Sequence, residues 1–329
     1  MPGVPLREGY DVAVLDLDGV VYIGDAAVPG AVDALIAAER AGMHLAFVTN
    51  NAARPPVAVA DHLTELGLPA RVEDVVTSAQ AAARVLAAQV PAGASVYVIG
   101  GEGLHDALLE RGLVPVTRPD AGASAVVQGF GPEMPWQQVI DGAILVRSGL
   151  PWVATNTDAT VPTPRGPGPG NGTLVDLVAR FADRRPVVAG KPQRPLFEET
   201  LARVGGTRPL VIGDRLDTDI DGAHGVGWDS LLVMTGVTGP AELASLAPDR
   251  RPTFLGADLS CLAEVPQEAV LEDGAARLGG WSACVRDERL EITGSGDATS
   301  WWRVLAAALW AHRDATGRDA DPGAVEPPR

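Results

Sequence analysis

The stretch VLDLDGVV, residues 14–21, decides the fold. It begins as an apolar run typical of a buried strand and then brings in two carboxylates, Asp16 and Asp18, followed by Gly19. Strand-forming residues bury well, whereas aspartate is rarely buried unless it is paired. The two acids are therefore expected at the end of a strand, where the core stops. A calcium loop of the EF-hand type is excluded, because valines stand where it needs an oxygen ligand and a glycine.

Strand-like and helix-like segments alternate along most of the chain. Short apolar runs followed by longer stretches with helical spacing recur up to residue 234, which predicts an α/β protein with a doubly wound, mostly parallel sheet. In such sheets ligands bind beyond the carboxyl ends of the strands. Strands are expected at 11–17, 44–50, 95–101, 125–130, 151–156, 187–190, 209–214 and 228–234. Helices are expected at 29–42, 55–67, 78–89, 102–112, 135–149, 173–183, 194–205 and 216–227.

Three domains are expected from this organisation. Residues 1–92 and 185–266 would form the core around the sheet, residues 93–184 an inserted α/β cap, and residues 267–329 a small α+β region. A cap of this kind excludes water and selects substrates. The pattern of the C-terminal region predicts two or three short antiparallel strands and one amphipathic helix. One face of that helix carries Trp302, Leu305, Ala306 and Leu309.

The charge and the cysteines limit the classes of partner. The 329 residues carry 26 basic and 42 acidic side chains, a formal net charge of −16. Nucleic acids and anionic membranes need clustered Lys and Arg, so neither is expected as a partner, whereas the charge leaves room for an anionic small substrate in a locally positive pocket. The two cysteines give neither a disulfide framework nor a zinc spacing, and no apolar signal core is found, which favours the cytoplasm. A homodimer formed through the cap or the C-terminal region stays an open expectation.

Four segments that end apolar runs carry the chemistry. They are DLDG at 16–19, TNN at 49–51, GKP at 190–192 and GDRLDTD at 213–219. A doubly wound sheet would bring all four to one edge. Crowded carboxylates repel one another unless a divalent cation joins them, and Mg²⁺ is the usual ion where a phosphate also coordinates. A metal, a lysine and oriented hydrogen-bond donors suit phosphoryl transfer, with one carboxylate free to act as nucleophile.

Together the four segments resemble the motifs of the haloacid dehalogenase-like superfamily. The resemblance implies that Asp16 is the nucleophile and a Mg²⁺ ligand. It implies that Asp18 is the general acid and base and binds Mg²⁺ through its backbone carbonyl, and that Lys191 stabilises the negative charge of the nucleophile and the phosphate. The phosphoryl oxygens would be held by Thr49, Asn50 and Gly19. The further metal ligands would be Asp214, directly, and Asp219, through a water.

The long insertion between the second and third segments is similar to subclass IIA of this superfamily, whose members carry a large α/β cap. Within that subclass the chain resembles the actinobacterial glycerol-3-phosphate phosphatases, over residues 10–256 closely and over the tail loosely. The tail of that family resembles part of an acyltransferase fold, but no acetyl-CoA-binding glycine loop is found here, so an inactive remnant is expected. The stretches that carry this resemblance are VVTSAQ (75–80), PGNG (169–172), VAGKP (188–192) and LVIGDRLDTDI (210–220).

The resemblance implies a Mg²⁺-dependent phosphatase that hydrolyses glycerol 3-phosphate through an aspartyl phosphate. Phosphoglycolate, pyridoxal phosphate and nucleotide monophosphates are alternative substrates. An alternative of another class is a catalytically silent, metabolite-binding regulator, against which the complete set of acids and lysine argues. The residues that are candidates for facing the substrate or the cap are Asn51, Asn156, Asp158 and Arg165. For Asp158 a turn-capping role, and for Arg165 a solvated position in a Pro/Gly loop, are the competing interpretations.

Overall fold

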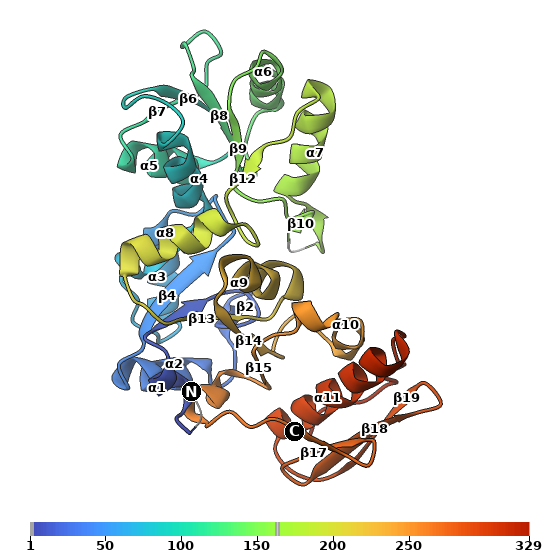
Figure 1. Cartoon of the computed structure of the whole chain (residues 1–329). Helices are drawn as coiled ribbons and strands as arrows, with labels where there is room; N and C mark the ends of the chain where they lie inside the picture. The colour runs from blue at the N-terminus through green and yellow to red at the C-terminus, as the bar shows by residue number, and fades with distance from the viewer. Residues whose placement is uncertain (1–2, 162, 164, 329) are drawn as a thin grey trace. The chain divides into compact units, whose positions relative to one another are not determined.

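The computed structural model describes residues 3–161, 163 and 165–328 (Figure 1). The chain folds into two compact units, one made of Met1–Leu45 with Gly206–Arg329 and the other of Ala46–Gly205. Helices alternate with parallel strands in both units, as the sequence pattern predicts. Among the described residues, every helix is too short or too polar to serve as a membrane span.

A parallel sheet with the strand order β15, β14, β13 and β1 organises the first unit. These strands span Phe254–Gly256, Asp229–Val233, Pro209–Gly213 and Val12–Leu15. All residues of β1 and β13 are buried, which is expected of parallel strands covered on both faces. Leu15 lies opposite Ile212, so β1 and β13 end side by side and the residues that follow them emerge at the same edge.

Short helices and turns connect these strands. They are α1 (Leu6–Gly9), the hairpin of β2 (Tyr22–Ile23) and β3 (Ala26–Ala27), α2 (Ala31–Arg40), α9 (Asp221–Val226), α10 (Pro240–Ala244) and 3₁₀ turns at Pro248–Arg250 and Leu259–Ala263. The single helix expected at 216–227 is interrupted: a π-helical turn, Leu216–Ile220, precedes α9. This turn brings the Asp219 side chain against Gly213, where any Cβ would collide with it. The sequence pattern missed this break because π turns have no composition of their own.

The C-terminal region contains four antiparallel strands, β16 (Val270–Glu272), β17 (Ala275–Leu278), β18 (Trp281–Arg286) and β19 (Arg289–Gly294). The prediction of two or three strands was too low, since all three residues of β16 are exposed and show no alternation. Helix α11 (Ala298–Thr316) lies against this sheet in Figure 1. Its predicted apolar face is confirmed, because Trp302, Leu305, Ala306 and Leu309 are all buried.

In the second unit, β4 (His44–Thr49), whose first two residues belong to the first unit, pairs in parallel with β5 (Val75–Thr77). A separate parallel sheet has the order β12, β9, β8, β6 and β7. Those strands are β6 (Ser95–Ile99), β7 (Val114–Val116), β8 (Ala125–Gln128), β9 (Trp152–Ala154) and β12 (Val187–Val188). The remaining elements are α3 (Pro56–Glu65), a 3₁₀ turn (Val72–Asp74), α4 (Ser78–Ala87), α5 (Glu102–Glu110), α6 (Trp136–Arg147), the hairpin of β10 (Thr160–Val161) and β11 (Gly168–Pro169), α7 (Asn171–Ala182) and α8 (Arg194–Val204).

Candidate functional site

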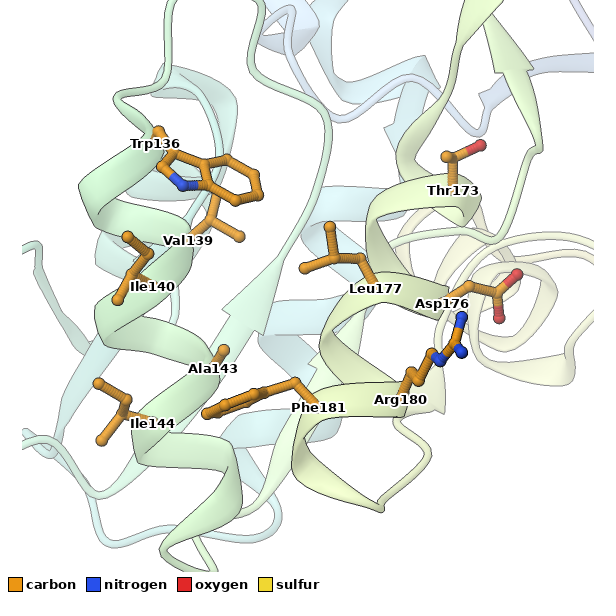
Figure 2. Close-up of a pocket in the computed structure, with 10 residues that line it drawn as sticks. All are labelled: Trp136, Val139, Ile140, Ala143, Ile144, Thr173, Asp176, Leu177, Arg180 and Phe181. Atoms are coloured by element: carbon orange, nitrogen blue, oxygen red, sulfur yellow. The ribbon is translucent and has the colours of Figure 1, made fainter.

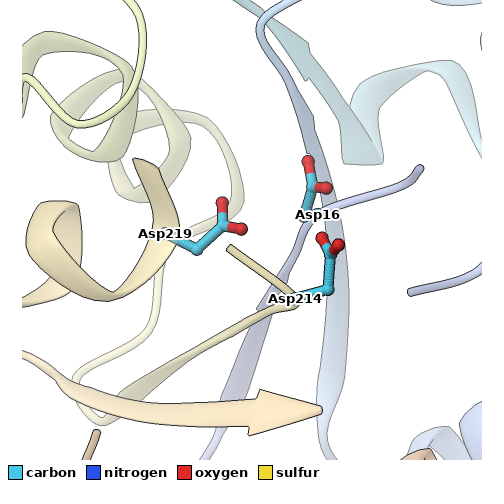
Figure 3. Close-up of side chains that lie close together, drawn as sticks. All are labelled: Asp16, Asp214 and Asp219. Atoms are coloured by element: carbon cyan, nitrogen blue, oxygen red, sulfur yellow. The ribbon is translucent and has the colours of Figure 1, made fainter. Parts of the chain in front are cut away.

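Three carboxylates meet at the edge of the first unit where β1 and β13 end. Asp16 follows β1, Asp214 follows β13, and Asp219 comes from the π-helical turn. One oxygen from each lies within 4.8 Å of the others, and Figure 3 shows the three side chains gathered in one place. Asp214 and Asp219 are buried and Asp16 is half-buried. We call Asp16, Asp214 and Asp219 the acid cluster.

Backbone contacts hold the acid cluster in place. The backbone N–H of Asp16 donates to the carbonyl of Ile212 at 2.8 Å, which continues the pairing of β1 with β13. The carboxylate of Asp214 accepts the Val237 N–H at 2.7 Å, and its carbonyl accepts the Thr238 hydroxyl at 2.6 Å. The loop after β14 therefore fixes Asp214 from the side opposite β1.

Glycine is required beside this acid. Gly19 has a φ of +88°, and a Cβ placed there would lie 2.6 Å from Oδ2 of Asp214. Its carbonyl accepts the Thr235 hydroxyl at 2.5 Å, so the DLDG turn is tied to the same loop that holds Asp214. The glycine of this motif thus serves close approach of the turn to a buried carboxylate.

The donor set of the acid cluster fits a magnesium ion. Three carboxylates gathered in a largely buried place repel one another, and a hard divalent cation with oxygen ligands offsets that repulsion. The side chains of Asp16 and Asp214 would hold it directly, and that of Asp219 through a water. Magnesium is the expected ion, because one or two carboxylates with waters and substrate phosphate oxygens are its usual ligands.

Asp18 stands apart from these three carboxylates. It is exposed, lies in a bridge with Tyr22, and its side chain does not belong to the acid cluster. Desolvation of its carboxyl group, followed by the neighbouring Asp16 charge, raises the pKa of Asp18. A raised pKa favours the protonated form, which is the form that a general acid needs.

A second group of polar side chains lies in the second unit, around Asn50. The side chain of Asn50, which follows β4, accepts the backbone N–H of Lys191 at 2.8 Å and donates to the Lys191 carbonyl at 3.1 Å. Lys191 is 4% exposed. Thr49 ends β4, and its hydroxyl accepts the Asn51 N–H at 3.0 Å. The second and third sequence motifs are thus joined by paired hydrogen bonds.

Asn156 and Asp158, two candidates in the loop after β9, both contact Asn50. The Asn50 amide donates to both carboxylate oxygens of Asp158 at 3.3 Å, and Asn156 donates to the Asn50 carbonyl at 2.8 Å. Asn156 is buried, whereas Asp158 is half-buried. We call Asn50, Asn156, Asp158 and Lys191 the asparagine cluster.

The other two candidates lie outside this cluster. Asn51 is exposed and its side chain accepts the Ala53 N–H at 2.9 Å, a local turn contact. Arg165 is exposed in a turn, where its N–H donates to the Thr163 hydroxyl at 3.2 Å.

Three further residues support the asparagine cluster, and sequence reasoning did not single them out. The Ser78 hydroxyl donates to the Asn50 carbonyl at 2.7 Å, and the Asn171 amide donates to the Asn156 carbonyl at 2.8 Å. Gln128, fully buried at the end of β8, donates to Asn171 at 3.4 Å. Each of the three lies at a strand end or in the first turn of a helix, which is the one signal that pointed to them.

Comparison with known proteins gives two family matches. Residues 13–114 match the model of the haloacid dehalogenase-like hydrolases, and residues 188–262 match that of the HAD-hydrolase-like proteins. These two stretches contain every residue of the acid cluster as well as Asn50 and Lys191.

Relatives with named activities match most of the chain. The D-glycerol 3-phosphate phosphatase of Mycobacterium tuberculosis is 40% identical over 317 residues, covering 94% of this chain and 88% of that protein. The 5'-nucleotidase YutF of Bacillus subtilis is 38% identical over 70% of this chain and 89% of its own length. A crystal structure of the glycerol phosphate phosphatase of M. tuberculosis with magnesium superposes with a TM-score of 0.84 at 39% identity, covering 94% of this chain and 93% of that one.

Proposed function

Because this chain belongs to the haloacid dehalogenase-like hydrolases, we propose that it hydrolyses glycerol 3-phosphate to glycerol and phosphate with Asp16 as the nucleophile. The chain is a phosphoric monoester hydrolase that uses Mg²⁺. Glycerol 3-phosphate is supported by the relative from M. tuberculosis, whose match extends over 94% of the chain. The matching crystal structure contains magnesium.

In the first proposed step a carboxylate oxygen of Asp16 attacks the phosphorus. The bond from phosphorus to the glycerol oxygen breaks, and Asp18 gives its proton to that oxygen. The position of Asp18 supports this role, because it lies two residues from Asp16 in the same turn and its carboxylate stands outside the acid cluster. The products of this step are glycerol and an aspartyl phosphate on Asp16.

In the second step water hydrolyses the aspartyl phosphate. Asp18, now ionised, takes a proton from the attacking water, and the bond between the Asp16 oxygen and phosphorus breaks to release phosphate. The side chains of Asp16, Asp214 and Asp219 and the backbone carbonyl of Asp18 would hold a magnesium ion, which when bound would offset the negative charge of the carboxylates and the phosphoryl oxygens.

We propose that the residues around Asn50 act on the same phosphoryl group. Lys191 would neutralise its charge, and Thr49 together with the backbone at Asn50 and Gly19 would orient its oxygens. The support is local: Asn50 fixes the Lys191 backbone by two hydrogen bonds, and Lys191 is buried rather than solvated.

One observation carries this proposal, namely the three carboxylates within 4.8 Å of one another at the ends of β1 and β13. The test is Mg²⁺-dependent phosphate release from glycerol 3-phosphate by the wild type and by Asp16→Asn. The variant should lose at least about 10³-fold in kcat, because the nucleophile is removed. Asp217→Asn is the matched control, since Asp217 pairs with Arg215 on the surface outside the acid cluster. Equal activity of Asp16→Asn and the wild type would remove the nucleophile assignment.

The substrate is tested with a set of phosphate monoesters. Nucleotide monophosphates are the second candidate substrates, because one of the relatives is a 5'-nucleotidase. The highest kcat/KM is expected with glycerol 3-phosphate, ahead of phosphoglycolate, pyridoxal phosphate and nucleotide monophosphates. If any of the last three esters gives a higher kcat/KM, that ester takes the place of glycerol 3-phosphate as the proposed substrate. Absence of turnover with every ester, nitrophenyl phosphate included, favours a metabolite-binding regulator.

The three-domain organisation is also a proposal. The two family matches stop at residue 114 and resume at residue 188, which supports an inserted cap near residues 93–184 with the core at 1–92 and 185–266. The separate five-stranded sheet and the antiparallel sheet of β16–β19 support the cap and the C-terminal domain of residues 267–329. Placement in the cytoplasm is a further proposal, supported by Cys261 and Cys284 both being free thiols.

We also propose that two copies of the chain pair through helices α6 and α7. Trp136, Ile140 and Ile144, spaced four residues apart, form an exposed row on α6, and Leu177 and Phe181 form another on α7. Figure 2 shows the two rows on either side of a groove of about 670 Å³. A ridge beside a groove is suited to an isologous contact, in which each copy inserts its ridge into the other's groove.

Area and charge favour a second copy as the occupant. These five side chains are 38–59% exposed and offer on the order of 500 Å² of apolar surface, against roughly 800 Å² per partner in a stable dimer. The two rows therefore provide the apolar centre of the contact, and the neighbouring polar residues provide its rim. Each helix carries one acid and one arginine, so this face is neutral on a chain of net charge −16. Two such chains repel one another least at a neutral face.

Sedimentation over a range of concentrations tests the pairing. The wild type should dimerise, and Ile144→Asp, which places a charge in the apolar row of each copy, should be monomeric. Leu271→Asp is the matched control, because Leu271 is equally exposed but lies on β16 in the C-terminal region. A monomeric wild type, or a dimer broken by Leu271→Asp alone, contradicts pairing through α6 and α7.

A further inference from the structure

The Asn50 side chain is shared between Lys191 and Asp158. Its oxygen accepts the Lys191 N–H at 2.8 Å, and its amide nitrogen donates to the Lys191 carbonyl at 3.1 Å. The same nitrogen also faces Asp158, whose carboxylate oxygens both lie at 3.3 Å. One amide therefore connects the residue proposed to neutralise the phosphate with a carboxylate from the loop after β9.

The carboxylate of Asp158 reinforces one orientation of the Asn50 amide, the same orientation that the Lys191 backbone favours. An amide has an accepting oxygen and a donating nitrogen at nearly the same positions, so it can rotate by a half-turn in place. A carboxylate only accepts, and it disfavours the rotated amide, whose oxygen would face it. With the nitrogen held toward Asp158, the Asn50 oxygen is directed at the Lys191 N–H.

The loop that carries Asp158 is itself fixed. The Asp158 carbonyl accepts the N–H of Gly172, in the first turn of α7, at 2.8 Å, and the Asp158 N–H donates to the Asn156 side chain at 3.2 Å. A Cβ at Gly172 would lie 2.9 Å from the Asp158 carbonyl, so the loop and the helix start are in close contact. Asp158 is thus held by its backbone and presents its carboxylate to Asn50.

The chain next to Lys191 leaves little room for adjustment. A Cβ at Gly190 would lie 2.5 Å from the Asn50 side-chain oxygen and would also collide with the Thr155 carbonyl. The Lys191 backbone therefore has one position against Asn50, and a rotated amide would place an N–H group opposite the Lys191 N–H. Such a contact costs the hydrogen bond and leaves a buried donor unsatisfied.

We propose that Asp158 is a positioning residue that acts through the Asn50 amide to set the place of Lys191. Asp158 does not contact the substrate. The inference rests on the proposed function, because the effect on turnover passes through the lysine. It replaces the sequence-based alternatives for Asp158, namely facing the substrate or capping a turn, with a role in holding the charge-neutralising side chain.

Steady-state kinetics with two substrates tests this role. Asp158→Ala should lower kcat roughly 10- to 100-fold, the range expected for a small misplacement of a catalytic group. The loss should be the same factor for glycerol 3-phosphate and for nitrophenyl phosphate, with each KM changed less than about threefold. Asp158→Asn, which keeps an accepting oxygen, should recover most of the loss. Asp120→Ala, the same change at an exposed acid that pairs with Arg118, is the matched control and should behave as the wild type.

A double-mutant cycle and hydrogen exchange complete the test. Asn50→Ala combined with Asp158→Ala should be no slower than Asn50→Ala alone, because both changes remove one chain of contacts. Exchange of the Lys191 amide should be faster in Asp158→Ala than in the wild type without any substrate present. Pro192 has no amide hydrogen, so a short peptide ending there isolates that signal.

These results separate the positioning role from the proposed function. A raised KM for glycerol 3-phosphate with unchanged kcat, additive effects in the cycle, or unchanged Lys191 exchange overturns the positioning role. If the wild type releases no phosphate, the proposed function fails, and the exchange measurement still decides whether Asp158 orders Lys191.

Discussion

The acid cluster and the asparagine cluster differ in how their polar groups are satisfied. In the acid cluster three carboxylates of the same sign face one another, two of them buried, and a bound cation would offset their repulsion. In the asparagine cluster donors face acceptors, as in the pair of hydrogen bonds between Asn50 and Lys191. The acid cluster is therefore a site that needs a bound ion, whereas the asparagine cluster is ordered by hydrogen bonds between its own members.

Removal of the metal is expected to have the largest effect on turnover. A chelator should abolish phosphate release, and added Mg²⁺ should restore it, because the acid cluster would otherwise be repulsive. Mg²⁺ should also raise the melting temperature of the wild type and of Asn50→Ala, since binding stabilises the folded state. It should not do so for Asp214→Asn. A Mg²⁺-dependent rise in Asp214→Asn as large as in the wild type contradicts the acid cluster as the metal site.

Loss of the lysine charge should have the next largest effect. Lys191→Met keeps the length of the side chain and removes the ammonium group, so kcat/KM should fall roughly 10²- to 10³-fold, as for other preorganised electrostatic groups. The Mg²⁺-induced rise in melting temperature should be retained, because Lys191 lies outside the acid cluster. Lys191→Met with full activity would show that the two clusters do not act on one phosphoryl group.

Asn50→Ala should have the smallest energetic effect. It distinguishes the hydrogen-bonded order of the asparagine cluster from the charge balance of the acid cluster. The change removes both partners of the Lys191 backbone and should lower the free energy of unfolding by about 1–3 kcal/mol. That loss corresponds to roughly 2–4 °C in melting temperature for each kcal/mol. It should be present with and without Mg²⁺, as measured by thermal unfolding in both conditions. A loss seen only with Mg²⁺ present would contradict a cluster ordered by its own contacts.

Two members of the acid cluster were predictable from the sequence pattern because they follow apolar strands. Asp16 and Asp214 come directly after β1 and β13, and parallel strands end at one edge, so the pattern alone placed them together. Asp219 was placed by family resemblance, and the π-helical turn that brings it back to the end of β13 has no sequence signature.

The asparagine cluster was less predictable because hydrogen bonds between loops have no periodic pattern. Asn156 and Asp158 were recognised as candidates, but their contacts with Asn50 depend on how the loop after β9 packs against the start of α7. Strand β16 was not predicted for a related reason, since an edge strand with every residue exposed lacks the alternation of apolar and polar residues that marks a strand.

The proposed aspartyl phosphate at Asp16 can be trapped by acid quenching. The wild type is mixed with Mg²⁺ and glycerol 3-phosphate carrying radiolabelled phosphate, quenched in acid during turnover, and digested. Label is expected on the peptide that contains Asp16, and none on the same peptide of Asp16→Asn. Label on another residue, or steady phosphate release with no labelled peptide, would contradict it.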